Sequence, residues 1–337
     1  MKKLIALLLA VLMAFSLVAC ADAPAGGDGD VTYAIVCKDA SNPYMSRMVS
    51  GFKTACEALG VKCIEKSPET TSVDDQITIV NELVAQNVKA IAIAANDAAA
   101  LEATLKAARD KGVAVVTLDS DTKGSQMFIN QAGVTQVAQV LVDSVYDMTG
   151  GEGEFAVLSA SSTATNQNSW IAAMKTIIEG DAKYAKLKWV ETVYGDDESQ
   201  KSTDETQNLM TKYPNLEVIC CPTTVGVLAC AQTVQNTEGC KIKVAGLGLP
   251  SEMKDYVGDD KVCPYMYLWN PIDVGSCAAY AIDAILDGKV GEVGTKFTAE
   301  NETEYEVMAG DPADQQIIVG PPFAFNGDNI ADWATVY

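Results

Sequence analysis

Short apolar runs alternate with longer amphipathic stretches along most of this chain, and this alternation constrains its fold more than any other feature. Polar residues or glycine occur within two residues of each end of the apolar runs, such as Ala90–Ala94 and Ala114–Leu118. Between the runs, apolar side chains recur at helical spacing, as in Tyr44–Leu59, which Gly60 terminates. Short strands separated by helices predict parallel sheets with helices covering both faces.

The alternation predicts an α/β fold with two open, Rossmann-like sheets, one in each half of the chain. The predicted strands are Val31–Cys37, Val61–Glu65, Ala90–Ala94, Ala114–Leu118, Glu154–Ser159, Lys188–Tyr194, Val218–Cys221, Lys243–Leu247, Cys263–Leu268 and, late in an irregular tail, Gln315–Val319. The predicted helices are Tyr44–Leu59, Val73–Gln86, Ala98–Lys111, Asn168–Glu179, Ser202–Lys212, Thr224–Gln235, Pro250–Val257 and a long helix from Pro271 to Leu286. Open α/β sheets bind ligands at the carboxyl ends of their strands, so candidate site residues are sought in the loops there.

The N-terminus has the pattern of a secretory signal. Two lysines precede an apolar run over Leu4–Val18, which is shorter than the about 20 residues of a transmembrane helix. The sequence LVAC over residues 17–20 resembles the bacterial lipobox, in which the cysteine is lipidated and becomes the mature N-terminus. We therefore expect a signal peptide over residues 1–19, a lipid on Cys20 and a flexible polar tether over residues 20–30.

Charge and composition exclude several classes of function. The chain has 24 Lys and Arg against 45 Asp and Glu, a formal net charge of −21, which disfavours nucleic acid and anionic membrane surfaces as partners. It has no histidine, which removes Ser-His-Asp and Cys-His catalysis and HExxH zinc sites. No P-loop, EF-hand or zinc spacing occurs, so we expect neither a cofactor nor a bound metal.

Nine cysteines follow Cys20, an odd number with no C-x-x-C spacing. Several lie in apolar runs, and we expect most of them to be small buried hydrophobic residues. A disulfide remains an alternative, because exported proteins usually pair their cysteines, and Cys56 and Cys63 are the candidate pair.

Lys38-Asp39-Ala40-Ser41-Asn42-Pro43-Tyr44 directly follows the first predicted strand. Lys38 and Asn42 could donate hydrogen bonds to a ligand, and Tyr44 could stack on it. The alternative is ordinary helix capping by Ser41 or Asn42, with Pro43 as the first helical residue.

Asp119 and Asp121 follow the strand Ala114–Leu118. Two carboxylates two residues apart lie on one side of the chain if the strand continues, so a paired-carboxylate hydrolase is conceivable. Aspartates also form turns. We favour carbohydrate binding, because a carboxylate accepts strong hydrogen bonds from hydroxyl groups.

Three further loops carry polar or aromatic side chains at predicted strand ends. The run of hydroxyls and amides over Ser159–Trp170 exceeds what a helix cap needs. Pro222–Gly226 follows Cys220-Cys221, and Trp269-Asn270-Pro271 follows Leu268. Trp269 could support the C–H face of a sugar ring, or it could pack in the core.

These loops, in this order, resemble those of the type I periplasmic-binding-protein superfamily, in particular the ribose-binding-like solute receptors of ABC transporters. The rhamnose-binding and autoinducer-2-binding receptors show the strongest similarity. The segments that carry the resemblance are SPETTSVDDQ (67–76), LDSDT (118–122), INQAG (129–133), ATNQNSW (164–170), PTTVG (222–226), GLGLPSEM (246–253) and LWNPID (268–273).

The resemblance implies a ligand site. Six positions correspond to the autoinducer-2 site of that group: Lys38, Asp119, Asn166, Gln167, Pro222 and Thr224. Asn166 stands where the autoinducer-2 receptors have an aspartate, and Thr224 where they have an alanine. At both positions this chain is more similar to the rhamnose-binding branch. The resemblance therefore implies a deoxyhexose such as rhamnose first, a pentose or other monosaccharide second and autoinducer-2 third. With the candidates from the loops, the expected ligand-binding residues are Lys38, Asn42, Tyr44, Asp119, Asp121, Asn166, Gln167, Pro222, Thr224, Trp269 and Asn270.

The resemblance also implies the organisation and partners of the chain. An N-terminal lobe of residues 31–130 and 270–319 and a C-terminal lobe of residues 131–269 and 320–337 would close on the sugar about three crossover strands. The protein would be a monomer without catalytic residues, held at the outer face of the cell membrane by its lipid and recognised by an ABC permease and ATPase. Two alternatives are a sensor subunit and an exported carbohydrate-active enzyme that uses Asp119 and Asp121.

Overall fold

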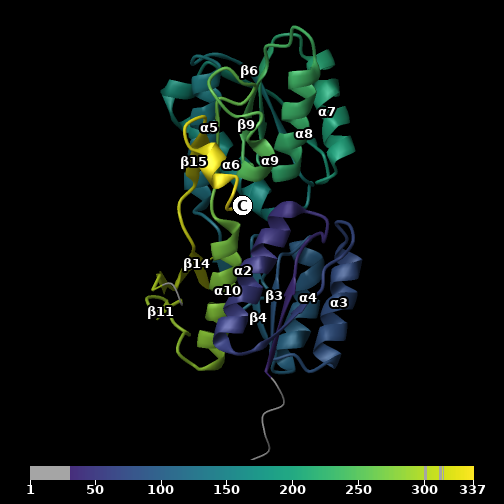
Figure 1. The fold of residues 1–337 in the computed structure, drawn as a ribbon, viewed down its shortest axis with the longest axis vertical. Helices are drawn as coiled ribbons and strands as arrows, with labels where there is room; N and C mark the ends of the chain where they lie inside the picture. The colour runs from purple at the N-terminus through teal and green to yellow at the C-terminus, as the bar shows by residue number, and fades with distance from the viewer. Residues whose placement is uncertain (1–30, 300–301, 311–312, 314) are drawn as a thin grey trace, which may run out of the picture. The chain divides into compact units, whose positions relative to one another are not determined.

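The computed structural model describes residues 31–299, 302–310, 313 and 315–337 (Figure 1). The predicted signal peptide, the lipidated Cys20 and the tether lie outside the described residues. Residues 32–337 form one compact unit. Within the described ranges, none of the helices is long and apolar enough to cross a membrane.

A seven-stranded sheet forms the N-terminal lobe, in the order β13-β14-β5-β4-β3-β1-β2. All neighbouring strands are parallel except β13 and β14. The strands are β1 (Thr32–Val36), β2 (Lys62–Glu65), β3 (Ala90–Ile93), β4 (Ala114–Leu118), β5 (Met127–Asn130), β13 (Met308–Ala309) and β14 (Gln315–Ile318). The predicted parallel strands of the first half of the chain are therefore confirmed.

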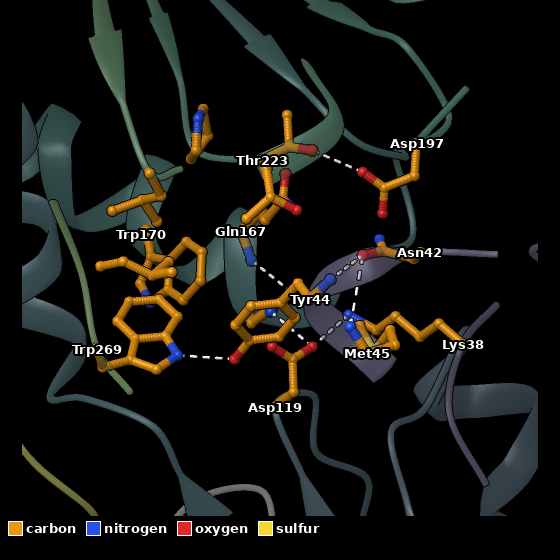
Figure 2. A pocket seen from close by; sticks show the side chains of 15 residues that line it. Lys38, Asn42, Tyr44, Met45, Asp119, Gln167, Trp170, Asp197, Thr223 and Trp269 are labelled. Atoms are coloured by element: carbon orange, nitrogen blue, oxygen red, sulfur yellow. Dashed lines mark hydrogen bonds and ion pairs between the residues drawn. The ribbon is translucent and has the colours of Figure 1, made fainter. Parts of the chain in front are cut away.

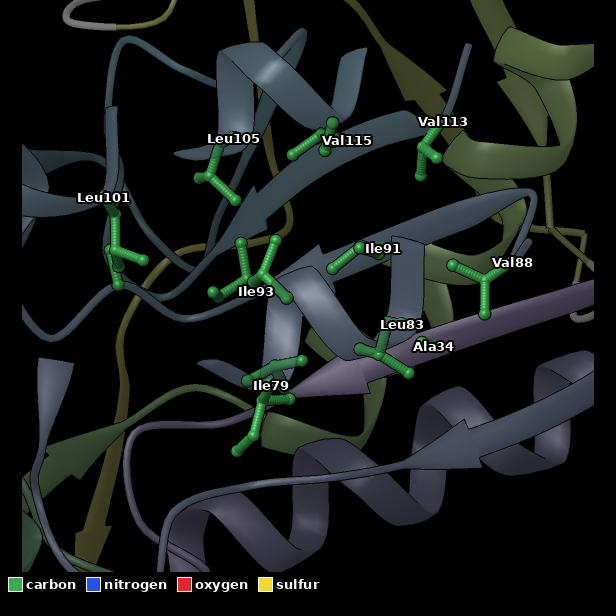
Figure 3. Packing of buried hydrophobic residues seen from close by; sticks show 14 residues of the cluster. Ala34, Ile79, Leu83, Val88, Ile91, Ile93, Leu101, Leu105, Val113 and Val115 are labelled. Atoms are coloured by element: carbon green, nitrogen blue, oxygen red, sulfur yellow. The ribbon is translucent and has the colours of Figure 1, made fainter. Parts of the chain in front are cut away.

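Helices cover both faces of this sheet (Figure 1). Helices α2 (Pro43–Leu59) and α10 (Pro271–Leu286) pack together, and α3 (Val73–Ala85) and α4 (Ala98–Asp110) pack together on the other face. Figure 3 shows the apolar layer under α3 and α4, which includes Leu83, Ile91, Ile93, Leu101 and Leu105. Each of these side chains is fully buried, and such burial stabilises a fold by about 1.5–3 kcal/mol per side chain.

A four-stranded parallel sheet in the order β7-β6-β8-β9 forms the C-terminal lobe. Its strands are β6 (Gly153–Ser159), β7 (Leu187–Tyr194), β8 (Leu216–Cys221) and β9 (Lys243–Gly246). Helix α5 (Val134–Met148) packs on α6 (Thr165–Gly180), and α7 (Ser199–Lys212) packs on α8 (Thr224–Asn236).

Two smaller antiparallel pairs of strands were not predicted. The strand predicted at Cys263–Leu268 is β10 (Tyr265–Leu268), and it pairs with β15 (Phe323–Asn326) rather than joining the four-stranded sheet. Strands β11 (Lys296–Thr298) and β12 (Glu304–Glu306) form the other pair. The remaining short helices are η1 (Ala182–Tyr184), α9 (Pro250–Met253) and α11 (Ile330–Trp333). The pairing of β10 depends on a strand far along the chain, and the local sequence pattern of β10 did not reveal that strand.

In the described residues, the chain crosses between the two lobes in three segments. After β5 it enters α5, after β10 it enters α10, and after β14 it enters β15, the partner of β10. The strand β5 and helix α5 were not among the predicted elements. The residue limits of the two lobes stay a prediction.

All nine cysteines after Cys20 are free in the structure. Seven are buried, and Cys63 and Cys240 are half-buried, which agrees with their interpretation as small hydrophobic residues. Burial raises the pKa of Cys220 to about 12, which suppresses its reactive thiolate at neutral pH. The candidate pair Cys56 and Cys63 lies in hydrogen-bond contact but is not bonded covalently.

We expect thiol titration of the denatured mature chain, with Cys20 blocked by lipid or replaced, to detect nine free thiols. Titration of the native protein should be slow, because most of these thiols are buried. A count of seven would instead show one disulfide, and its loss in Cys56→Ser would assign the bond.

Two glycines allow close approach of α2 and α10. A Cβ atom on Gly275 of α10 would lie 1.8 Å from the carbonyl oxygen of Met48, and one on Gly51 of α2 would lie 2.0 Å from that of Ile272. These partners are backbone atoms, so the helices would have to separate to admit a methyl group.

We expect Gly275→Ala to lower the free energy of unfolding by about 1–3 kcal/mol or more, because it overpacks this contact. Gly180→Ala is the matched control, since Gly180 ends α6 and a Cβ atom there would have no neighbouring atom within 4 Å. It should change stability by less than about 1 kcal/mol. Equal effects of the two substitutions in urea unfolding would contradict the close packing of α2 on α10.

Candidate ligand-binding site

A small pocket with about 30 Å³ of free space lies between the two lobes, where strands of both sheets end (Figure 2). Nine of the eleven residues predicted to bind ligand line it: Lys38, Asn42, Tyr44, Asp119, Asn166, Gln167, Pro222, Thr224 and Trp269. The other lining residues are Met45, Trp170, Asp197, Thr223, Leu247 and Leu268.

A buried ion pair forms the polar side of the pocket on the N-terminal lobe. Lys38 follows β1 and Asp119 follows β4, and the Lys38 Nζ lies 2.7 Å from the Asp119 Oδ2. The same oxygen accepts hydrogen bonds from the Ser120 hydroxyl at 3.3 Å and from the Asn166 amide of the C-terminal lobe at 3.2 Å. A buried carboxylate needs such donors, because removing a charge from water is costly.

The backbone of Asp119 is left-handed, with φ of 62°. The strand alternation therefore ends at Leu118, and Asp121 does not line the pocket beside Asp119. Backbone conformations that are rare for residues other than glycine often occur at functional sites, where the surroundings hold them.

Asp121 has structural contacts instead. Its carboxylate accepts hydrogen bonds from the Thr117 hydroxyl, the Thr122 N–H at 2.7 Å, the Ser125 hydroxyl at 3.2 Å and the Ala313 N–H at 2.9 Å. Burial raises the pKa of Asp121, although these donors oppose the shift. The two aspartates thus do not form the paired carboxylates of a hydrolase.

Asn42 both caps α2 and lines the pocket. Its Oδ1 accepts a hydrogen bond from the Tyr44 N–H at 2.9 Å, and Pro43 is the first helical residue. The capping and binding interpretations are therefore compatible, with the amide nitrogen as the donor that remains for a ligand.

Three aromatic side chains form an apolar wall. The Trp269 Nε1 donates to the Tyr44 hydroxyl at 2.7 Å, and the ring of Trp269 lies 5.6 Å from that of Trp170 (Figure 2). All three residues are buried. Burial and then the Asp119 charge raise the pKa of Tyr44 well above its usual value, so its phenol stays neutral.

The first turn of α6 supplies amides from the C-terminal lobe. The Gln167 Oε1 accepts hydrogen bonds from the Ser159 hydroxyl at 2.7 Å and the Ala160 N–H at 2.8 Å. These bonds orient the Gln167 amide, so its Nε2 is the group with which it can address a ligand. The long polar run before this helix thus holds a pocket side chain in place.

Asn270 lies outside the pocket lining. Its Oδ1 accepts from the Ile272 N–H at 3.0 Å and caps α10. In the loop after β8, Thr223 caps α8 and lines the pocket with its neighbours Pro222 and Thr224.

The residues predicted from the sequence do not include Asp197, because the acidic run Asp196-Asp197-Glu198 is typical of a solvated surface. Asp197 lines the pocket, and the Thr223 hydroxyl donates to its Oδ1 at 2.6 Å. Its place just beyond the carboxyl end of β7 was the signal that could have found it. Among the described residues, no cluster of acidic side chains and cysteines could hold a metal ion.

We expect Lys38→Met to lower the free energy of unfolding by about 3 kcal/mol, because it leaves the Asp119 carboxylate buried without its cation. Lys53→Met is the matched control, since Lys53 pairs with Glu65 on the surface, where ion pairs contribute at most about 1 kcal/mol. Urea unfolding without ligand would measure both. Similar small effects would show that the Asp119 charge is well solvated.

The chain belongs to the periplasmic binding protein family, since the model of the periplasmic binding protein domain matches residues 33–290. The predicted family, its α/β fold and the expectation that the chain is not an enzyme are thereby confirmed.

Its relatives include sugar-binding proteins. An ABC transporter solute-binding protein from Clostridium phytofermentas, solved with bound L-rhamnose, is 47% identical, with a TM-score of 0.88 over 92% of this chain and 99% of that chain. The D-allose-binding periplasmic protein of Escherichia coli is 28% identical over 77% of this chain and 86% of its own length. LsrB from Clostridium saccharobutylicum in complex with AI-2 is 24% identical, with a TM-score of 0.83 over 90% of this chain and 99% of that chain. At this identity, the comparison shows that the two chains share a fold.

Proposed function

We propose that this protein is the extracytoplasmic substrate-binding component of an ABC import system and captures a neutral monosaccharide between its lobes. The observation that carries the proposal is the juxtaposition of a buried hydrogen-bonding cluster around Asp119 with the aromatic wall of Tyr44, Trp170 and Trp269. Sugar rings have hydroxyl edges and C–H faces, so they match both surfaces of the pocket.

A deoxyhexose such as L-rhamnose is the favoured ligand. Its methyl group and ring C–H bonds suit the aromatic wall, and its hydroxyls suit Lys38, Asp119, Asn166 and Gln167. The 47% identical relative with bound L-rhamnose supports this ranking. A pentose or another monosaccharide is second, and autoinducer-2 is third.

Hydrogen bonds between the lobes support a mechanism of closure. The Asn166 amide donates to Asp119, the Thr163 hydroxyl to the Asn96 carbonyl at 3.3 Å, and the Thr165 hydroxyl to the Asp121 carbonyl at 3.5 Å. A sugar that contacts Asp119 and Gln167 together would favour the state in which these bonds form. The permease would then recognise that closed state.

The anchoring and organisation remain part of the proposal. The signal peptide and the lipid on Cys20 would hold the protein at the outer face of the cell membrane. The protein would act there as a monomer, with lobes limited as the sequence predicts and with the permease and ATPase as its partners.

We expect L-rhamnose to raise the melting temperature in a screen of neutral monosaccharides and autoinducer-2. At about 100 times its dissociation constant, a ligand stabilises the folded state by about 2.7 kcal/mol. Absence of a shift with every neutral monosaccharide would contradict the proposal, and a shift with autoinducer-2 alone would reverse the ranking of ligands.

Tryptophan fluorescence would locate the bound sugar. We expect the ligand-induced change to be lost or reduced in Trp269→Phe, because Trp269 lines the pocket. It should persist in Trp189→Phe, since Trp189 lies on β7 outside the pocket lining. The opposite pattern would place the ligand elsewhere.

A further inference from the structure

Asp197 has an unusual backbone at the edge of the pocket. It follows Asp196 in the loop after β7, and both residues are left-handed, with φ of 55° and 54°. Aspartate tolerates this conformation better than most residues, yet two in succession are uncommon. The turn directs the Asp197 side chain to the pocket, whereas the Asp196 carboxylate pairs with Lys201 on α7.

The Asp197 side chain is oriented by the neighbouring loop. The Thr223 hydroxyl donates to its Oδ1 at 2.6 Å, and Thr223 is itself fixed as the N-cap of α8. Figure 2 shows the carboxylate between Thr223 and Asn42, across the pocket from the aromatic wall. Its Oδ2 is the acceptor that remains for a ligand.

The charges of the pocket lining do not balance. Its charged side chains are Lys38, Asp119 and Asp197, and Lys38 pairs with Asp119. Burial raises the pKa of Asp197, and the nearby Asp119 and Asp39 carboxylates act in the same direction, whereas Thr223 and Lys38 oppose the shift. Asp197 is half-buried, so its carboxylate is only partly solvated and can accept further hydrogen bonds.

We propose that Asp197 is a specificity-determining residue that accepts a hydrogen bond from a ligand hydroxyl and selects neutral polyhydroxylated sugars against sugar acids and sugar phosphates. The inference rests on the proposed function and adds a second carboxylate contact, separate from that of Asp119. A hydroxyl group satisfies Asp197, whereas an anionic group would meet a carboxylate without a paired cation, and that repulsion disfavours it.

Asp197→Asn is the principal test. The amide keeps an Oδ1 that can accept from Thr223 and it tolerates a left-handed backbone, so the variant removes mainly the charge and the second acceptor. Asp196→Asn is the matched control, because it makes the same change at the adjacent left-handed residue, whose carboxylate pairs with Lys201.

We expect Asp197→Asn to weaken the binding of L-rhamnose, or of whichever neutral sugar binds most tightly to the wild type, by at least about tenfold in calorimetry. Asp196→Asn should change that affinity by less than about twofold. The melting temperature without ligand should be similar in both variants. Equal affinity of Asp197→Asn and wild type would overturn the inference.

The affinities of related ligands distinguish direct contact between Asp197 and the ligand from a purely structural role of Asp197. Among monodeoxy analogues of the bound sugar, one should bind less tightly than the parent to the wild type but about equally to Asp197→Asn. The affinity ratio of a sugar acid, such as D-galacturonate, to its neutral parent should also rise in that variant. If every analogue loses affinity by one common factor, Asp197 acts structurally and the inference fails.

A second substitution covers the case in which Asp197→Asn does not fold. Asp197→Gly removes the carboxylate at a left-handed position that favours glycine, with Asp196→Gly as its control. The same loss of affinity and selectivity is expected, and wild-type affinity in Asp197→Gly would overturn the inference. If the wild type binds no neutral sugar, the proposed function fails, a result distinct from wild-type-like binding by the variants.

Discussion

The buried ion pair between Lys38 and Asp119 is the interaction on which the rest of the site depends. It joins the ends of two strands of the N-terminal sheet, and its carboxylate also accepts a hydrogen bond from Asn166 of the other lobe. One acidic group thereby connects three distant parts of the chain. Because its charge is held away from water, the surrounding donors must stay in place, and this requirement organises the polar side of the pocket.

Asp119 and Asp121 show how local conformation separates residues that the sequence places together. Asp119 adopts a left-handed backbone and lines the pocket, whereas Asp121 binds donors as far along the chain as Ala313. The alternation of a strand would have placed both carboxylates on one side. The left-handed backbone of Asp119 therefore leaves only one of the two carboxylates in the pocket lining, unlike the paired carboxylates of a hydrolase.

Much of the fold and the site could be predicted because it depends on local patterns. The strands Ala90–Ile93 and Ala114–Leu118 and the helices around them follow from apolar periodicity, and polar residues beyond strand ends identify the pocket lining. The pairing of β10 with β15 joins segments about 55 residues apart, and β10 carries no signal of its partner. The orientation of the Asp197 side chain depends on its contact with Thr223, 26 residues away, which the sequence pattern does not reveal.

The sequence by itself determined the alternating α/β architecture, the acidic character of the chain, the absence of histidine chemistry and the loops that could meet a ligand. These properties depend on composition and on periodicity over a few residues. The tertiary structure decided which of those side chains face one pocket. Asp197 lines the pocket, whereas Asp121 and Asn270 make structural contacts outside it. The ring of Trp269 packs between those of Tyr44 and Trp170. These outcomes depend on long-range packing and on individual backbone angles, which local patterns do not encode.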